Sequence, residues 1–324
     1  MQTGRQGALL EEQYIEKGDL ILSIRISVQI CSYNRSHLLE RSLRALMAQD
    51  LPKDEYEIVF VDDGSTDGSA DMARGLAAEA ACRIKVLTKT NDGLSRARNL
   101  GIRNCEGEVI LFMDDDTFAD PSLLREHLAV HDQCPRCVVL GWVNHIEELD
   151  PQGPRKYGVA DYSRSFFWTS NVSVRKKFVE EAGLFDEDFL EYGWEDLELG
   201  WRLKQLGLER RTNNKAIVSH FKPPKQKKDL PGMLRQAASS GRSALVYVKK
   251  RPTLNAHMAT GITWPRMLLD QLLRLFGPIF QSGVDHAPEG PLRGWSFWCA
   301  RILCSFIFFD AVRKGDTRRP ERGA

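Results

Sequence analysis

Four short apolar runs alternate with helical patterns along the first third of the 324-residue chain, at a spacing of roughly thirty residues. The runs occupy residues 26–30, 56–61, 84–87 and 109–113. Apolar runs of this length predict buried strands, whereas the leucines that follow Ser36 recur at helical spacing. Strand–helix alternation of this kind predicts an α/β fold in which helices flank a mostly parallel central sheet.

Polar clusters follow three of these runs. Ser-Tyr-Asn stands at 32–34, Asp-Asp-Gly-Ser at 62–65 and Asp-Asp-Asp at 114–116. The carboxyl ends of parallel strands meet at one edge of a sheet, and ligands bind at that edge. We therefore expect the three clusters to contribute to one binding site.

Three adjacent carboxylates, Asp114, Asp115 and Asp116, make the last cluster strongly acidic. They repel one another unless a cation or hydrogen-bond donors lie among them. Carboxylate oxygens suit Mg²⁺ or Mn²⁺, and such an ion can bridge a diphosphate and neutralise charge on a leaving group. The alternative is an exposed acidic turn that caps a helix beginning near Pro121.

Two other positions carry carboxylates with a possible chemical role. Asp63 follows a predicted strand, where it can accept the N–H of a uracil or guanine edge, although its surroundings also read as a common turn around Gly64. Glu195 and Asp196 begin a predicted helix. Acidic residues in a first helical turn complement the helix dipole, but a carboxylate there also suits a general base for an acceptor hydroxyl.

Five motifs occur in a fixed order along the chain. They are Ser-Tyr-Asn-Arg at 32–35, Asp-Asp-Gly-Ser at 62–65, Gly-Leu-Ser-Arg-Ala-Arg-Asn at 93–99, Phe-Met-Asp-Asp-Asp at 112–116 and Trp-Glu-Asp at 194–196. Together they resemble glycosyltransferase family 2, the inverting enzymes with the Rossmann-like GT-A fold. The resemblance extends over about residues 26–221, and its second half looks like the acceptor half of the β-1,4-galactosyltransferase type.

The resemblance implies a nucleotide-sugar donor, with a UDP-sugar favoured, and a glycan or glycolipid acceptor. It assigns donor contacts to Tyr33, Asn34, Arg35, Asp63, Arg98, Asp114 and Asp115. It assigns the sugar pocket to Asn171 and Trp194. It assigns a Mn²⁺ or Mg²⁺ site to Asp114, Asp116 and His220, although a lone histidine after a strand is as often structural.

By the same resemblance, Asp196 is the catalytic base and Glu195 supports it. Retaining relatives carry asparagine at the position of Asp196, so the aspartate favours inversion of the transferred sugar. Two other functions stay open. A sugar nucleotidyltransferase requires a glycine-rich phosphate loop after its first strand, where this chain has Cys-Ser-Tyr-Asn at 31–34. An inactive donor-binding partner subunit does not require the carboxylates that this chain retains.

The predicted organisation is a lead-in at 1–25, a nucleotide-binding half at 26–116, an acceptor half at 117–221 and a last region at 222–324. The last region begins with a lysine- and proline-rich stretch, which predicts a flexible loop, and continues with helical patterns. Apolar residues recur on one helical face there, at Leu268, Leu272, Leu275 and Phe276. This face predicts peripheral membrane contact, packing on the catalytic domain or a homodimer.

The composition of the chain bears on nucleic-acid binding, on the state of its cysteines and on its location in the cell. The net charge of +1 argues against nucleic-acid binding. Seven cysteines form no disulfide framework, and the spacing of Cys134 and Cys137 lacks a second pair for zinc, so we expect reduced thiols in a cytoplasmic protein, possible also at the inner face of the membrane. No signal peptide and no apolar run of membrane-spanning length is visible in the sequence.

Overall fold

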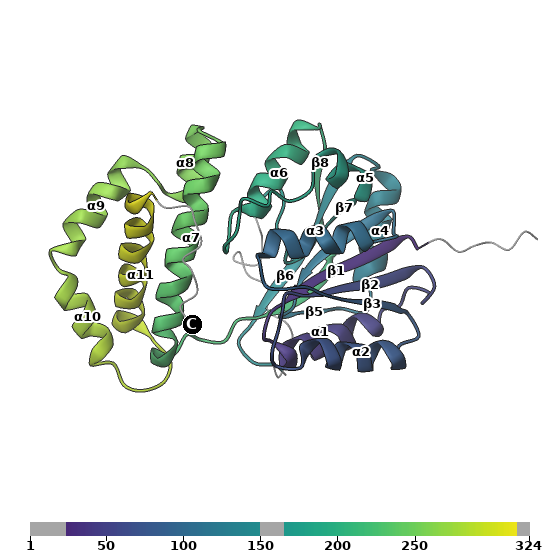
Figure 1. Cartoon of the computed structure of the whole chain (residues 1–324), viewed down its shortest axis with the longest axis horizontal. Coiled ribbons are helices and arrows are strands. Elements are labelled where there is room, and N and C mark those ends of the chain that lie inside the picture. The colour runs from purple at the N-terminus through teal and green to yellow at the C-terminus, as the bar shows by residue number, and fades with distance from the viewer. Residues whose placement is uncertain (1–23, 150–164, 316–324) are drawn as a thin grey trace, which may run out of the picture.

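The computed structural model describes residues 24–149 and 165–315. These residues form an eight-stranded sheet covered by helices, followed by a separate group of helices (Figure 1). The predicted α/β fold with a C-terminal helical region is therefore confirmed. Of the predicted lead-in, all but the last two residues lie outside the described part of the chain.

The first half of the sheet follows the predicted alternation closely. Its elements are β1 (Ile26–Ser32), α1 (Ser36–Met47), β2 (Tyr56–Asp62), α2 (Ser69–Glu79), β3 (Arg83–Thr88), α3 (Leu94–Asn104) and β4 (Val109–Asp114). Every residue of β2 is buried, which explains why this strand reads as a continuous apolar run and not as an alternating pattern.

The second half is less regular. Its elements are β5 (Thr117–Ala119), α4 (Leu123–Gln133), β6 (Cys137–Ile146), β7 (Val172–Arg175), α5 (Lys176–Glu181), α6 (Glu195–Gln205) and β8 (Glu209–Phe221). The sequence did not predict β7 as a strand, because its four residues lead directly into α5. It also missed the first part of β8, which is polar and mostly exposed.

The strand order is β3-β2-β1-β4-β7-β6-β8-β5. Strand β1 pairs in parallel with both β2 and β4, so the direction of the chain across the sheet reverses beside β1. Open α/β sheets bind ligands at such a switch point, at the carboxyl ends of the strands. The register sets Cys31 opposite Asp114 and Ser32 opposite Asp62, so the predicted polar clusters do meet at one edge.

Alternation of side chains along the strands builds one hydrophobic core on each face of the sheet. Ile26, Val28 and Ile30 of β1 lie in the core that α1, α2 and α4 cover. Ile110 and Phe112 of β4 lie in the core on the other face, which α3, α5 and α6 cover (Figure 1). The two cores fix the central strands from both sides and thereby hold the carboxyl edge in place.

The C-terminal region consists of helices, as predicted. They are α7 (Leu230–Lys250), α8 (Leu254–Thr260), α9 (Trp264–Arg274), α10 (Gly277–Asp285) and α11 (Gly294–Lys314). Helices α7 and α11 approach each other closely at Gly241, where an added Cβ would lie 2.5 Å from the Phe308 carbonyl oxygen. Helices α9 and α10 lie on the side of α11 that faces away from the sheet (Figure 1).

The stretch after β8, predicted to be a flexible loop, is partly regular. It contains a 3-10 turn, η2 (Lys227–Asp229), and Pro231 occupies the first turn of α7, where its missing N–H costs no helical hydrogen bond. Lys227 Nζ donates to the carbonyl oxygens of Asp285 and Ala287 at 2.8 and 2.9 Å. Lys227 therefore fastens this turn to the helical region.

Helix α11 is the one helix in the described ranges that is long and apolar enough to cross a membrane, judged by length and composition. The sequence had predicted none. Part of its apolar character serves the helical core, because Cys299, Ala300 and Phe306 pack with Phe280 and Val284 of α10.

A buried polar network connects α4 to the sheet. Asn171 Oδ1 lies 2.8 Å from His127 Nε2, and Ser173 Oγ lies 2.8 Å from both His127 Nδ1 and His131 Nε2. Since an amide oxygen only accepts, His127 must donate from Nε2 and accept the Ser173 hydroxyl proton at Nδ1. Burial lowers the pKa of His127 to about 4 and that of His131 to about 3.

These pKa values predict that the fold weakens in mild acid. The unfolded histidines bind protons below about pH 6.5 and the folded ones do not, so stability should fall from pH 6.5 downwards. Between pH 7.5 and 5 we expect a loss on the order of 2 kcal/mol for each histidine. Urea unfolding of the His131→Gln variant should show lower stability at pH 7.5 but a shallower loss towards pH 5. Equal pH dependence in variant and parent would contradict the prediction.

Candidate donor and metal site

Three carboxylates cluster where β4 ends and the chain turns into β5. Ser32 Oγ donates to Asp115 Oδ2 at 2.6 Å, and Arg35 Nη1 donates to Asp115 Oδ1 and Asp116 Oδ2, both at 2.9 Å. Burial raises the pKa of Asp115, and Arg35 opposes that shift. Arg35 thus offsets the mutual repulsion of the carboxylates, in agreement with its predicted place at the site.

The pairing of β5 with β8 brings His220 to this cluster, because it sets Thr117 opposite His220. His220 Nε2 lies 3.1 Å from Asp116 Oδ1. One ligand atom each from Asp114, Asp116 and His220 lies within 4.8 Å of the others. Burial works to raise the pKa of Asp116, but His220 and Arg35 hold it below its ordinary value.

This group fits a divalent cation. Two carboxylates suit Mn²⁺ or Mg²⁺, and a neutral imidazole is a common third ligand. Asp116 Oδ1 is buried and, within residues 24–149 and 165–315, accepts no hydrogen bond of good geometry, although His220 Nε2 lies 3.1 Å from it. Ser170 Oγ donates to Asp114 Oδ2 at 2.5 Å and so orients that carboxylate. A cation between the two aspartates would supply the ligand contact that Asp116 Oδ1 lacks.

The predicted contacts to the nucleotide base lie at the neighbouring strand ends. Asp63 is buried directly after β2, and Tyr33 is exposed directly after β1. Burial raises the pKa of Asp63, whereas Lys89, whose Nζ donates to Asp63 Oδ1 at 2.7 Å, acts in the opposite direction. Lys89 was not predicted as a site residue, since a single lysine after a strand carries no motif.

Asn34 was predicted to contact the donor, but its side chain holds two loops together. Its Oδ1 accepts the Thr66 N–H at 2.8 Å, and its backbone N–H donates to Ser65 Oγ at 2.9 Å. The residue has a left-handed φ of 54°, which asparagine tolerates better than most residues. Asp67 reinforces the same junction, because its Oδ2 accepts the N–H of Ser36 at 2.9 Å. Asn34 therefore shapes the edge of the site.

Arg98 joins the two halves of the site. This buried guanidinium donates from Nη1 to Glu195 Oε1 at 2.5 Å and from Nη2 to Thr169 Oγ1 at 2.8 Å. Its Nη2 also lies 3.8 Å from Asp114 Oδ1. Arg98 thus extends from the metal cluster to the start of α6, where it contacts two carboxylates and a hydroxyl of the protein; its contact with a donor stays a prediction.

Asp196 lies in the first turn of α6 beside this ion pair. Burial, reinforced by the adjacent Glu195 carboxylate, raises its pKa to about 7, although Arg98 and the Leu197 N–H act against the shift. The Leu197 N–H donates to Asp196 Oδ1 at 2.7 Å. A carboxylate with a pKa near neutrality exchanges protons readily at physiological pH, which is the property that a general base needs.

The two residues predicted to line the sugar pocket are engaged elsewhere. Asn171 is buried, and its amide nitrogen donates to the carbonyl oxygens of Trp142 and Ala216 at 3.1 and 3.0 Å. Its oxygen lies 2.8 Å from His127 Nε2, so Asn171 fastens the sheet, and its place in the sugar pocket stays a prediction. Trp194 directs its indole N–H to the Ser240 carbonyl oxygen of α7 at 3.0 Å.

Tyr192, which was not predicted, does face the site. Its side chain is exposed, and its pKa is raised to about 12 by burial of the hydroxyl and by the carboxylates of Asp114, Glu195 and Asp196. The influence of these three carboxylates on its pKa indicates that the phenol lies near the metal-binding group and Asp196. An aromatic residue directly before Gly-Trp-Glu-Asp was a signal, but an aromatic there could equally have been buried.

The comparisons with known proteins bear on the family and the fold of the chain. Residues 27–181 match the profile of glycosyl transferase family 2. The chain is 34% identical over 221 residues to validoxylamine A glucosyltransferase from Streptomyces hygroscopicus subsp. jinggangensis, with 56% of this chain and 52% of that protein covered. It is 28% identical to the uncharacterized glycosyltransferase YfnE of Bacillus subtilis, with 62% and 66% covered. Residues 27–181 are therefore similar to glycosyl transferase family 2, and the named relatives support that family.

The chain spans about half the length of the first curated relatives that it matches. Two solved structures share its fold over most of its length. Mannosyltransferase PcManGT from Pyrobaculum calidifontis, in complex with GDP-Man and Mn²⁺, gives a TM-score of 0.61 at 15% identity, covering 89% of this chain and 87% of that one. S. aureus TarS 1-349 in complex with UDP-GlcNAc gives 0.54 at 19% identity, covering 90% and 92%.

The metal group makes the first prediction from the site. Replacing Asp116 by Asn keeps the shape but removes an anionic ligand, so Mn²⁺ affinity should fall more than tenfold. His220→Gln should act in the same direction. Isothermal titration with Mn²⁺ alone measures the effect, with Asp71→Asn on the exposed face of α2 as the matched control. Mn²⁺ affinity unchanged in both site variants would show that these residues do not bind the metal.

Proposed function

We propose that the chain is a metal-dependent, inverting glycosyltransferase that moves a sugar from a nucleotide-sugar donor to an acceptor hydroxyl. The observation that carries the proposal is the shared edge of the sheet, where a metal-binding group and a near-neutral carboxylate meet. Asp114 and Asp116 belong to the metal-binding group, and Asp196 is the carboxylate with the near-neutral pKa. Arg98 bridges them through Glu195. The family of residues 27–181 supports the same reaction.

The donor would lie across the switch point of the sheet. Tyr33 and Asp63 would contact the base, and Asp115 would face the ribose, held in place by Ser32 and Arg35. A Mn²⁺ or Mg²⁺ ion held by the metal-binding group would neutralise charge on the departing nucleoside diphosphate. Arg98, buried behind Asp114, would limit the free rotation of that carboxylate and keep it directed at the site.

Asp196 would act as the general base on the acceptor side. It would take the proton of the acceptor hydroxyl while that oxygen bonds to the anomeric carbon and the bond to the diphosphate oxygen breaks. One displacement from the opposite face inverts the sugar. Glu195, paired with Arg98, would help to keep the pKa of Asp196 near 7. Tyr192 would border the acceptor, since it faces both carboxylates.

The donor that we propose is a UDP-sugar, and the acceptor a cell-surface polysaccharide or a glycolipid. Asp63 suits the N–H edge of uracil or guanine, and the solved relatives include one bound to UDP-GlcNAc and one bound to GDP-Man. A thermal-shift screen with UDP-, GDP-, CDP- and dTDP-sugars in Mn²⁺ separates these donors. We place the enzyme in the cytoplasm, in line with the free thiols of its cysteines in the described ranges.

The other two functions have less support. A sugar nucleotidyltransferase requires a glycine-rich phosphate loop after its first strand, but that position holds Cys31 to Asn34. An inactive donor-binding subunit does not require a carboxylate whose pKa is tuned to about 7. Release of free sugar and nucleotide from a donor in Mn²⁺ distinguishes an active enzyme from such a subunit.

The base is tested by the nearly isosteric Asp196→Asn substitution. Removal of the proton acceptor should lower turnover by roughly 10²–10⁴ while donor affinity persists. Turnover is followed by release of the nucleoside diphosphate, and donor affinity by calorimetry in Mn²⁺. Asp54→Asn, at an exposed position before β2, is the control. If affinity and turnover fell together, Asp196 would be a donor ligand or a structural cap instead.

The pKa of Asp196 also predicts a pH profile. Only the ionised form accepts a proton, so turnover should rise about tenfold per pH unit up to pH 7 and then level off. The residual activity of Asp196→Asn should lack this rise. A parent profile that is flat between pH 5.5 and 8 would exclude Asp196 as the titrating base.

A further inference from the structure

Large apolar side chains are exposed mainly in one part of the helical region. Fourteen large hydrophobic residues are exposed in the described ranges, and eleven of them lie between residues 254 and 298. We call these eleven the apolar surface: Leu254, Met258, Trp264, Leu268, Leu269, Leu272, Leu275, Phe276, Ile279, Trp295 and Trp298. Exposed apolar residues gathered in this way mark an interaction site.

Helix α9 forms the middle of the apolar surface. Leu268, Leu272 and Leu275 recur at helical spacing and are 48%, 52% and 76% exposed. Asp270, on the opposite side of the helix, is buried. Helix α9 lies on the side of α11 that faces away from the sheet (Figure 1). Since Asp270 accepts from Arg313 of α11, the exposed leucine face points away from α11. The predicted packing of this face on the catalytic domain is wrong.

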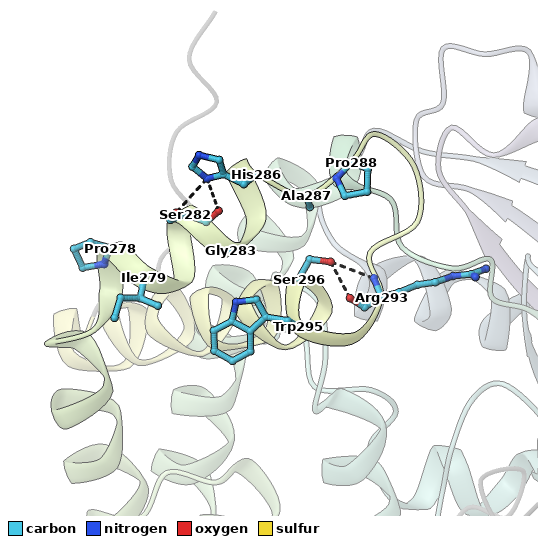
Figure 2. Close-up of a pocket in the computed structure, with 10 residues that line it drawn as sticks. All are labelled: Pro278, Ile279, Ser282, Gly283, His286, Ala287, Pro288, Arg293, Trp295 and Ser296. Atoms are coloured by element: carbon cyan, nitrogen blue, oxygen red, sulfur yellow. Dashed lines mark hydrogen bonds between the residues drawn. The ribbon is translucent and has the colours of Figure 1, made fainter.

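The apolar surface continues from α10 onto the start of α11. Ile279 and Trp295 line one cavity of about 660 Å³, which Figure 2 shows between the two helices. The rings of Phe280 and Trp295 are 6.2 Å apart. Trp295 and Trp298 follow one another on α11 at a spacing of three residues, and both are exposed. A third exposed tryptophan, Trp264, begins α9.

Charged side chains of both signs border the apolar surface. Arg266, Arg293 and Arg301 are exposed on or beside it, and Asp285 and Glu289 are exposed at the end of α10 and in the loop that follows it. Glu289 Oε1 lies 3.3 Å from Lys227 Nζ. The exposed face of α9 carries no carboxylate, because Asp270 accepts from Arg274 at 2.9 Å and from Arg313 at 2.8 Å inside the helical region. Arginines beside an apolar face suit anionic groups.

We propose that the apolar surface docks on an anionic lipid bilayer. Tryptophan favours the boundary between hydrocarbon and headgroups, leucine and phenylalanine bury below it, and arginine pairs with lipid phosphate. A second copy of the chain is a poorer occupant. A two-fold interface would set the same arginines of both copies close together, without carboxylates on α9 to pair with them. Lipid phosphates supply the missing negative charge.

Docking does not require α11 to leave the helical core. Cys299 and Ala300 are fully buried, and Gly283 of α10 packs so closely that an added Cβ would lie 2.5 Å from Cys299 Sγ. The middle of α11 is therefore held inside the bundle. Only its first turns, which carry Trp295 and Trp298, reach the apolar surface.

The test is flotation of the full chain with vesicles of phosphatidylcholine, with and without phosphatidylglycerol. The parent should float with the anionic vesicles and more weakly with the neutral ones. Replacing Leu268, Leu272 and Leu275 together by Gln should lower binding at least tenfold, because these exposed side chains support no core. The pair Arg266→Glu and Arg301→Glu should remove the preference for anionic lipid. Arg74→Glu, an exposed arginine on α2, is the matched charge control.

Sedimentation without lipid examines the competing occupant. The proposal expects the leucine variant and the parent to have the same oligomeric state and the same urea unfolding curve. A parent dimer that the leucine variant converts to monomers, together with no flotation of the parent, would overturn the proposal in favour of a second copy. Flotation that the leucine variant retains in full would overturn it as well. Neither measurement involves glycosyl transfer, so the proposed catalytic function stands or fails separately.

Discussion

The ion pair of Arg98 with Glu195 is the interaction on which the candidate site depends. Asp114, Glu195 and Asp196 come from distant parts of the chain and would repel one another without a cation among them. Arg98 is only 6% exposed, and its guanidinium also lies over the Phe185 ring at 5.2 Å. Removing one partner of a buried pair typically costs about 3–5 kcal/mol, because it leaves a buried charge without compensation. The arginine therefore belongs to the site and to the fold at once.

The helical region completes the site from the other side. The Tyr192 backbone N–H donates to Ser239 Oγ at 3.0 Å, and Arg242 binds the Glu191 carboxylate through Nε and Nη2. Trp194 adopts a left-handed φ of 75°, which places it against α7 and starts α6 at Glu195. Such a backbone conformation is unfavourable for tryptophan, so contacts with α7 must maintain it. The base and its neighbours are thus set by a helix that lies outside the sheet.

Sequence reasoning succeeded where one residue type has one dominant role. Apolar runs predicted the central strands, because a strand buried on both faces consists mostly of apolar residues. The acidic residues after β4 predicted the carboxyl edge of the sheet. It did not find the contacts of polar side chains that have several possible partners. Asn171 and Asn34 were predicted to contact the donor or its sugar, and the structure shows their amides bound to backbone groups. Nothing in the order of residues tells whether an amide meets a ligand or a carbonyl oxygen. The sequence also did not predict the polar first part of β8, because this part pairs with β6 but is mostly exposed.

Two faces of the helical region have proposed roles, and the way they are joined bears on which class of acceptor the protein would use. One face, on α7, holds the loop that leads to Asp196, and the other is the apolar surface of α9, α10 and the start of α11. Close packing at Gly241 connects α7 to α11, and packing of Gly283 on Cys299 connects α11 to α10. Helices packed this closely move together. Docking of the apolar surface on a bilayer would therefore hold Asp196 at a fixed distance from the lipid headgroups. A glycolipid would then present its hydroxyl within a narrow range of heights, whereas a soluble glycan would gain nothing from the arrangement. Of the two acceptor classes, the geometry of the helical region favours the glycolipid.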